Sequence, residues 1–99
     1  MDKAKLRREK RKLERLRQHP ANIRAQELIN LAEALGRERS NRGKEPTFIS
    51  LLLPDSNPIS IPNHPGSLSR FTAGNILDAL EQDIFNLEEM LESNGENND

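Results

Sequence analysis

Residues 47–62, TFISLLLPDSNPISIP, decide the fold of this chain. Thr47 to Leu53 combines β-branched, aromatic and leucine side chains, which is typical of a strand. Pro54 to Asn57 has the composition of a turn. Pro58 to Pro62 predicts a second, shorter strand with its two isoleucines on one face, and its flanking prolines favour the edge of a sheet. The centre of the chain is therefore predicted to form antiparallel sheet.

Two amphipathic helices are predicted on either side of these strands. Arg24 to Leu35 carries apolar side chains at helical spacing, and Gly36 is a natural stop. Thr72 to Glu92 carries a longer apolar stripe, with Thr72 as the expected N-cap. The polar segment Arg37 to Lys44 gives only a weak strand signal. Helix, two or three antiparallel strands and helix together predict a two-layer α+β domain.

Charge is distributed unevenly along the chain. Residues 1–44 hold 14 of the 15 Lys and Arg residues and 6 acids, whereas residues 45–99 hold one base and 10 acids. Lys3 to Gln18 consists of good helix formers, and Pro20 should end the helix. Its leucines have heptad-like spacing, but the segment spans only about one and a half heptads, which is too short for a coiled coil, so we expect an exposed, partly frayed helix. The predicted organisation is a basic helical extension at 1–19, the α+β domain at 20–92 and a disordered acidic tail at 93–99.

Composition excludes several classes of protein. The chain has 99 residues, of which 33% are hydrophobic, and no run of them is long enough to span a membrane. The basic N-terminus lacks the apolar segment of a secretory signal, so we expect a cytoplasmic location. The absence of cysteine excludes disulfides, thiolate metal sites and cysteine nucleophiles. With only His19 and His64 as histidines, we expect no metal site and no cofactor.

The basic segment has three readings. It can attract nucleic acid through phosphate contacts, pair with the acidic C-terminal helix of this chain or of a partner, or remain solvated. It contains no aromatic residue of the kind that stacks on single-stranded bases. If RNA binds, the candidate contacts are Lys3, Lys5, Arg7, Arg8, Lys10, Arg11, Lys12, Arg15, Arg17, Arg37, Arg39, Arg42 and Lys44.

Several segments, in order, resemble the HicA-like toxins. Residues 19–28 (HPANIRAQEL) and 31–36 (LAEALG) are similar to the opening of that family. Residues 59–66 (ISIPNHPG) and 71–80 (FTAGNILDAL) are similar to its third strand, the following loop and its second helix. The resemblance implies a double-stranded-RNA-binding-like α-β-β-β-α fold, here with an extra basic N-terminal helix. Family members are toxins of type II toxin–antitoxin systems that cleave mRNA and are neutralised by a HicB-type antitoxin.

One family motif is altered in this chain. The family's catalytic histidine lies in a Gly-Ser-His-x-x-Phe motif, and residues 43–48 read GKEPTF, so that Lys44 replaces the serine and Glu45 the histidine. Histidine exchanges a proton near neutral pH, whereas an exposed glutamate stays ionised and repels phosphate. His64 lies in a Pro/Gly-rich loop, where a histidine can act as a general acid or base. The candidate catalytic residues are therefore Glu45 and His64.

Three functions follow as hypotheses. The first is a HicA-like domain with impaired nuclease chemistry that binds RNA or an antitoxin-like protein. The second is an active, metal-independent endoribonuclease toxin that uses His64 or Glu45 in a rearranged site. The third is a protein–protein interaction module unrelated to RNA that self-associates through its basic and acidic helices.

Overall fold

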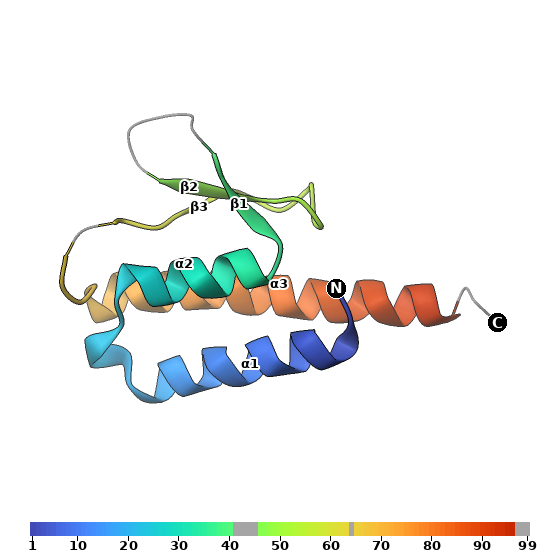
Figure 1. Cartoon of the computed structure of the whole chain (residues 1–99), viewed down its shortest axis with the longest axis horizontal. Coiled ribbons are helices and arrows are strands. Elements are labelled where there is room, and N and C mark those ends of the chain that lie inside the picture. The colour runs from blue at the N-terminus through green and yellow to red at the C-terminus, as the bar shows by residue number, and fades with distance from the viewer. Residues whose placement is uncertain (41–45, 64, 97–99) are drawn as a thin grey trace.

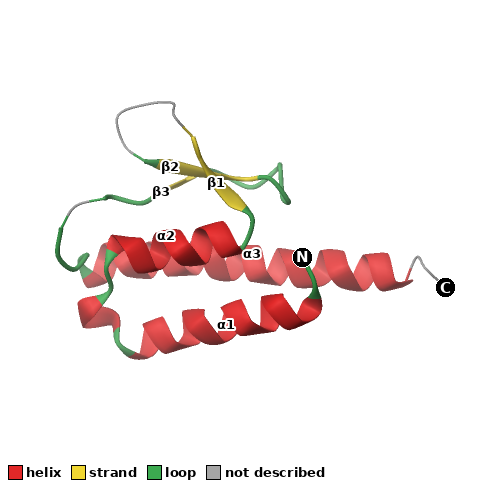
Figure 2. Cartoon of the chain, viewed as in Figure 1, coloured by secondary structure: helices red, strands yellow, loops and turns green. Residues whose placement is uncertain are grey.

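The computed structural model describes residues 1–40, 46–63 and 65–96, with the backbone only for 94–96. Figures 1 and 2 show the order of its elements: α1 (Lys3–Gln18), the short 3-10 helix η1 (Pro20–Asn22), α2 (Ala25–Ala34), β1 (Arg37–Ser40), β2 (Thr47–Ser50), β3 (Ile59–Ser60) and α3 (Arg70–Glu96). The described part of the chain thus forms a small α+β fold with a three-stranded antiparallel sheet, which confirms the predicted fold class.

Residues 20–92 form the predicted two layers, a sheet and a pair of helices, and α1 adds a third layer. The sheet has the order β1-β2-β3, with Arg37 paired to Ser50 and Phe48 paired to Ile59. α2 and α3 lie on one face of the sheet, and α1 lies on the far side of these two helices (Figure 1). The basic helix therefore forms a layer of its own, and α2 and α3 separate it from the sheet.

α1 is a packed helix. It begins after Asp2, whose carboxylate accepts a hydrogen bond from the Lys5 backbone N–H at 2.7 Å, and it ends at Gln18 before Pro20, as predicted. Leu6 and Leu13 are buried and belong to the same hydrophobic cluster as the other two helices and the sheet. The expectation of an exposed helix was therefore wrong, because two leucines seven residues apart are enough to bury one face against α3 and α2.

The central strands and the last helix differ from prediction at their ends. β2 stops at Ser50, and residues 51–58 form bends and turns that lead into a two-residue β3. α3 begins at Arg70, because the Ser69 hydroxyl accepts the Thr72 backbone N–H at 3.1 Å; Ser69, not Thr72, caps the helix. It continues to Glu96, so residues 93–96 of the predicted disordered tail are helical. Residues 97–99 lie outside the described residues.

Gly36 ends α2, as expected, by adopting a positive φ of 93°. This conformation favours glycine because a side chain would crowd the backbone. A Cβ atom here would also lie 2.6 Å from Leu52 Cδ1. Gly36 therefore lets the chain turn from α2 into β1, and its lack of a side chain leaves room for Leu52 to pack against its backbone. Within the described segments, no helix combines the length and the apolar character needed to cross a bilayer.

Candidate nucleic-acid interface

The outer face of α1 is lined by arginines. Leu13 points into the core, and Arg11 and Arg15 each lie two residues away, which is about 200° around an α-helix. Arg7 lies one turn before Arg11, and Arg8 is its neighbour on the same side. Burial of the leucine face thus turns four guanidinium groups outward, and we call Arg7, Arg8, Arg11 and Arg15 the arginine row.

The arginine row is not neutralised within the described chain. All four side chains are exposed, and no ion pair joins them to a carboxylate of the described residues. Like charges four residues apart destabilise a helix by about 0.2–0.5 kcal/mol for each pair. Arg7, Arg11 and Arg15 make two such pairs, so the row contributes a small unfavourable energy to a helix that its cap and its buried leucines stabilise.

The basic residues at the α3 side of α1 are paired. Lys10 Nζ lies 3.6 Å from Glu88 Oε1, and Arg17 Nη2 lies 2.7 Å from Asp78 Oδ1 and 3.5 Å from Glu81 Oε1. For these residues the reading in which the basic segment folds back on the acidic helix is confirmed. These two residues therefore already have carboxylate partners in the described chain.

The side of α1 that faces α2 holds a further pair. Lys12 Nζ lies 3.2 Å from Oε1 of Glu9, which is 4% exposed. Lys3 and Lys5, in the first turns of the helix, are exposed and form no ion pair with a described carboxylate. The unpaired positive charge of α1 therefore extends from these lysines through the arginine row.

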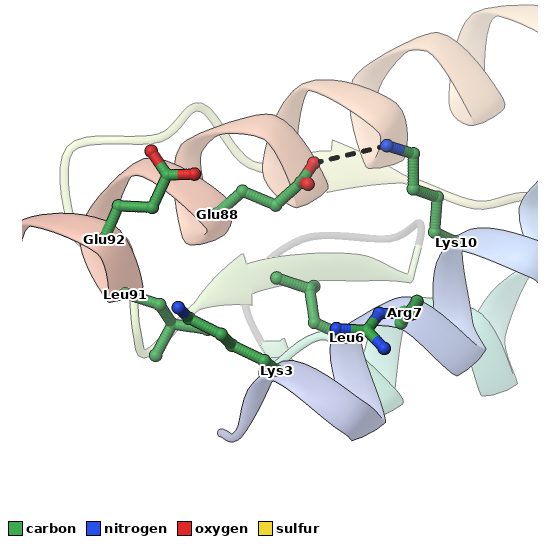
Figure 3. A pocket seen from close by; sticks show the side chains of 7 residues that line it. All are labelled: Lys3, Leu6, Arg7, Lys10, Glu88, Leu91 and Glu92. Atoms are coloured by element: carbon green, nitrogen blue, oxygen red, sulfur yellow. Dashed lines mark ion pairs between the residues drawn. The ribbon is translucent and has the colours of Figure 1, made fainter. Parts of the chain in front are cut away.

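A pocket of about 360 Å³ borders the N-terminal part of the row, between α1 and α3. Figure 3 shows Leu6 and Leu91 facing this space, with Lys10 and Glu88 joined across one side. Lys3 and Arg7 on one wall and Glu88 and Glu92 on the other give the rim charges of both signs. This mixed rim marks where the positive surface ends and the acidic surface of α3 begins.

Arg37 is a structural residue. Its side chain is 2% exposed, with Nε 2.6 Å from Asp83 Oδ2 and Nη2 2.9 Å from Asp83 Oδ1. Nη1 donates to the carbonyl oxygens of Phe48 at 2.9 Å and Asn57 at 3.1 Å. The expectation that Arg37 contacts phosphate was wrong, because its donors already join β1 to α3, β2 and the loop before β3. β1 is held by its antiparallel pairing with β2, and Arg37 is the one buried residue of its four.

The structure does not bring together all the remaining candidates. Arg39 is exposed on β1, which lies on the opposite side of α2 and α3 from the arginine row (Figure 1). Arg42, Lys44, Glu45 and His64 lie outside the described residues. Among the residues that are described, no group of three His, Cys, Asp or Glu side chains is arranged to hold a metal ion.

Three residues that sequence reasoning missed lie near the C-terminal end of α1. The Leu68 backbone N–H donates to the Ile23 carbonyl at 2.8 Å, which places exposed Arg24 beside the segment that leads into α3. Arg70 and Phe71, at the start of α3, are also exposed. Since Arg24 and Phe71 are 47 positions apart along the chain, no local motif could have joined them.

Comparison with known proteins gives no match: no family model, no curated protein and no solved structure is similar to this chain. The resemblance to the HicA-like toxins therefore stays a prediction from the sequence.

Proposed function

We propose that this protein is an RNA-binding module of the HicA-like type, with impaired nuclease chemistry, that binds phosphates through the arginine row. The observation that carries the proposal is the row itself: four exposed guanidinium groups that form no ion pair with a described carboxylate. Arginine presents a planar fork of donors that matches phosphate oxygens, and it keeps its charge at every physiological pH.

The fold supports the family part of the proposal. α2, the three antiparallel strands and α3 follow one another in the α-β-β-β-α order that the resemblance implies, and both helices lie on the same face of the sheet (Figure 2). Impaired catalysis is supported by the sequence at residues 43–48, where Glu45 occupies the family's histidine position. Losing a general base typically lowers a rate by about 10²–10⁴-fold.

Salt dependence is the first test of phosphate contact. Four contacts to a single strand give a slope of log K against log salt of roughly −2.8. Raising the salt concentration from 50 to 200 mM should therefore weaken binding by about 50-fold. The measurement is fluorescence anisotropy of an end-labelled RNA of mixed sequence, titrated with the protein at several salt concentrations.

Matched single variants locate the contact. Arg11→Gln removes one charge from the row and should make the salt slope shallower by about 0.7. Arg39→Gln removes the same charge on the sheet side and should leave the slope unchanged. The combined variant R7Q/R8Q/R11Q/R15Q should lose the salt-dependent binding. Equal slopes for R11Q and R39Q would show that the row is not the contact surface.

RNA integrity separates binding from cleavage in the same samples. We expect the labelled RNA to remain intact, with or without EDTA. EDTA-resistant cleavage that His64→Ala abolishes would instead make the protein an active metal-independent ribonuclease. Failure to bind RNA at any salt concentration would overturn the proposal and leave a protein partner, such as a HicB-type antitoxin, as the alternative.

A further inference from the structure

Phe71 is an aromatic side chain that the core does not use. It is 79% exposed, more than any other large hydrophobic residue described, and lies in the first turn of α3. The neighbouring apolar residues Leu68 and Ala73 are buried at 3% and 1%. The apolar packing at the start of α3 is therefore complete without the phenylalanine ring.

Two arginines lie close to Phe71 in the fold. Arg70 precedes it and is exposed, and Arg24 is brought nearby by the bridge between Arg24 and Ser67. Within the described chain, neither arginine takes part in an ion pair. The carboxylate of Glu27 accepts the Arg24 backbone N–H at 3.1 Å and serves to cap α2. The ring is thus accompanied by two guanidinium groups free to contact phosphate.

Phe71 also lies toward the end of α1 that carries Arg17. Arg17, in the last turn of α1, pairs with Asp78, which is seven residues beyond Phe71 on α3. Seven residues correspond to about 10 Å along the helix and only about 20° around it, so Asp78 and Phe71 share a face. Figure 1 shows the beginning of α3 at the same end of the molecule as η1 and the end of α1.

We infer that Phe71, flanked by Arg24 and Arg70, is a base-stacking subsite beyond the C-terminal end of α1, and that it directs the protein to single-stranded RNA. An aromatic ring stacks on the face of an unpaired base, while neighbouring arginines hold the adjacent phosphates. In a duplex the base faces are covered by neighbouring pairs, so the ring has no surface to contact. This inference rests on the proposed RNA-binding function.

The expected effect is selective. Base–aromatic stacking of 1–3 kcal/mol corresponds to a loss of about 5- to 150-fold in affinity when the ring is removed. Phe71→Ala should therefore weaken binding of an unstructured single strand by that factor and leave binding of a duplex of the same charge unchanged. Phe71→Leu keeps the apolar bulk without the aromatic face and should behave like the alanine variant.

The chain offers a clean spectroscopic test, since it contains no Trp and no Tyr. Phe71→Trp introduces a single tryptophan whose fluorescence is quenched when a base stacks on it. Phe85→Trp is the matched control, because Phe85 is also exposed on α3, 14 residues or about 21 Å further along nearly the same face. Phe85 lies among Glu81, Glu88 and Glu89, where phosphate is repelled.

We expect a single-stranded oligoribonucleotide to quench F71W and not F85W. If wild-type protein binds RNA through the arginine row but F71A binds single strands as tightly as wild type, or both tryptophans respond equally, the stacking inference is wrong and the RNA-binding function stands. If wild-type protein binds no RNA, both fail together.

Discussion

Two arginine–aspartate pairs lie on opposite sides of α3, and their environments differ. Arg37 and Asp83, on the sheet side, form a bidentate pair whose side chains are 2% and 3% exposed. Arg17 and Asp78, on the α1 side, form a single contact with side chains 34% and 70% exposed. The buried pair therefore joins β1 to α3 without screening by water, whereas the exposed pair joins α1 to α3 at the surface, where water screens its charges.

Disruption of the buried pair should destabilise the protein far more than disruption of the exposed pair. Replacing Asp83 with Asn leaves the buried Arg37 guanidinium without its counter-charge, which should lower the free energy of unfolding by about 3–5 kcal/mol. Urea denaturation followed by far-UV circular dichroism measures the change. The double variant R37M/D83L removes both charges and should recover most of the loss. A D83N protein within 1 kcal/mol of wild type would show that the pair is not a structural element.

On the side of the exposed pair, apolar packing should hold α1 in place. Leu13 is 1% exposed between the helices, and Leu13→Ala should cost about 2–5 kcal/mol through lost burial and the cavity it leaves. Leu51→Ala, at a position 62% exposed, is the control and should change stability little. Similar unfolding midpoints for L13A and wild type would mean that apolar packing does not anchor α1.

The smallest effect is expected at the exposed pair itself. Asp78→Asn removes the partner of Arg17 and should change the free energy of unfolding by less than about 1 kcal/mol, because solvent and salt screen exposed charges. The difference from wild type should shrink further when the urea titrations are repeated in high salt. A loss as large as that of D83N would show that the two environments are equivalent.

The periodic elements were the most predictable part of the fold. α2, β2 and α3 were anticipated because their side-chain spacing reports directly on one buried face. β1 gave only a weak signal, because its residues are polar and the burial of Arg37 depends on Asp83, 46 positions later. A charged residue is buried only if it meets a partner, and a short stretch of sequence cannot show a partner that lies far away in the chain.

The candidate interface was predictable in its location but not in its members. The basic content of residues 3–17 identified the helix, yet a count of charges treats Arg17, paired with α3, and Arg11, facing outward, as equal. The division between them is set by which side of α1 its leucines bury. Phe71 lies at the same end of the molecule as the end of α1 because η1 and the start of α3 pack together there.

The packing of α1 on α3 also fixes an order of events during synthesis. The segment containing Leu6 and Leu13 leaves the ribosome before the other described elements, and α3, against which these leucines pack, is the last of them to emerge. At typical elongation rates the delay is several seconds, during which α1 lacks its contacts with α3 and most of its stability must come from tertiary packing that is still incomplete. The nascent chain therefore displays a basic segment that acquires its ordered arginine face only when translation has passed α3.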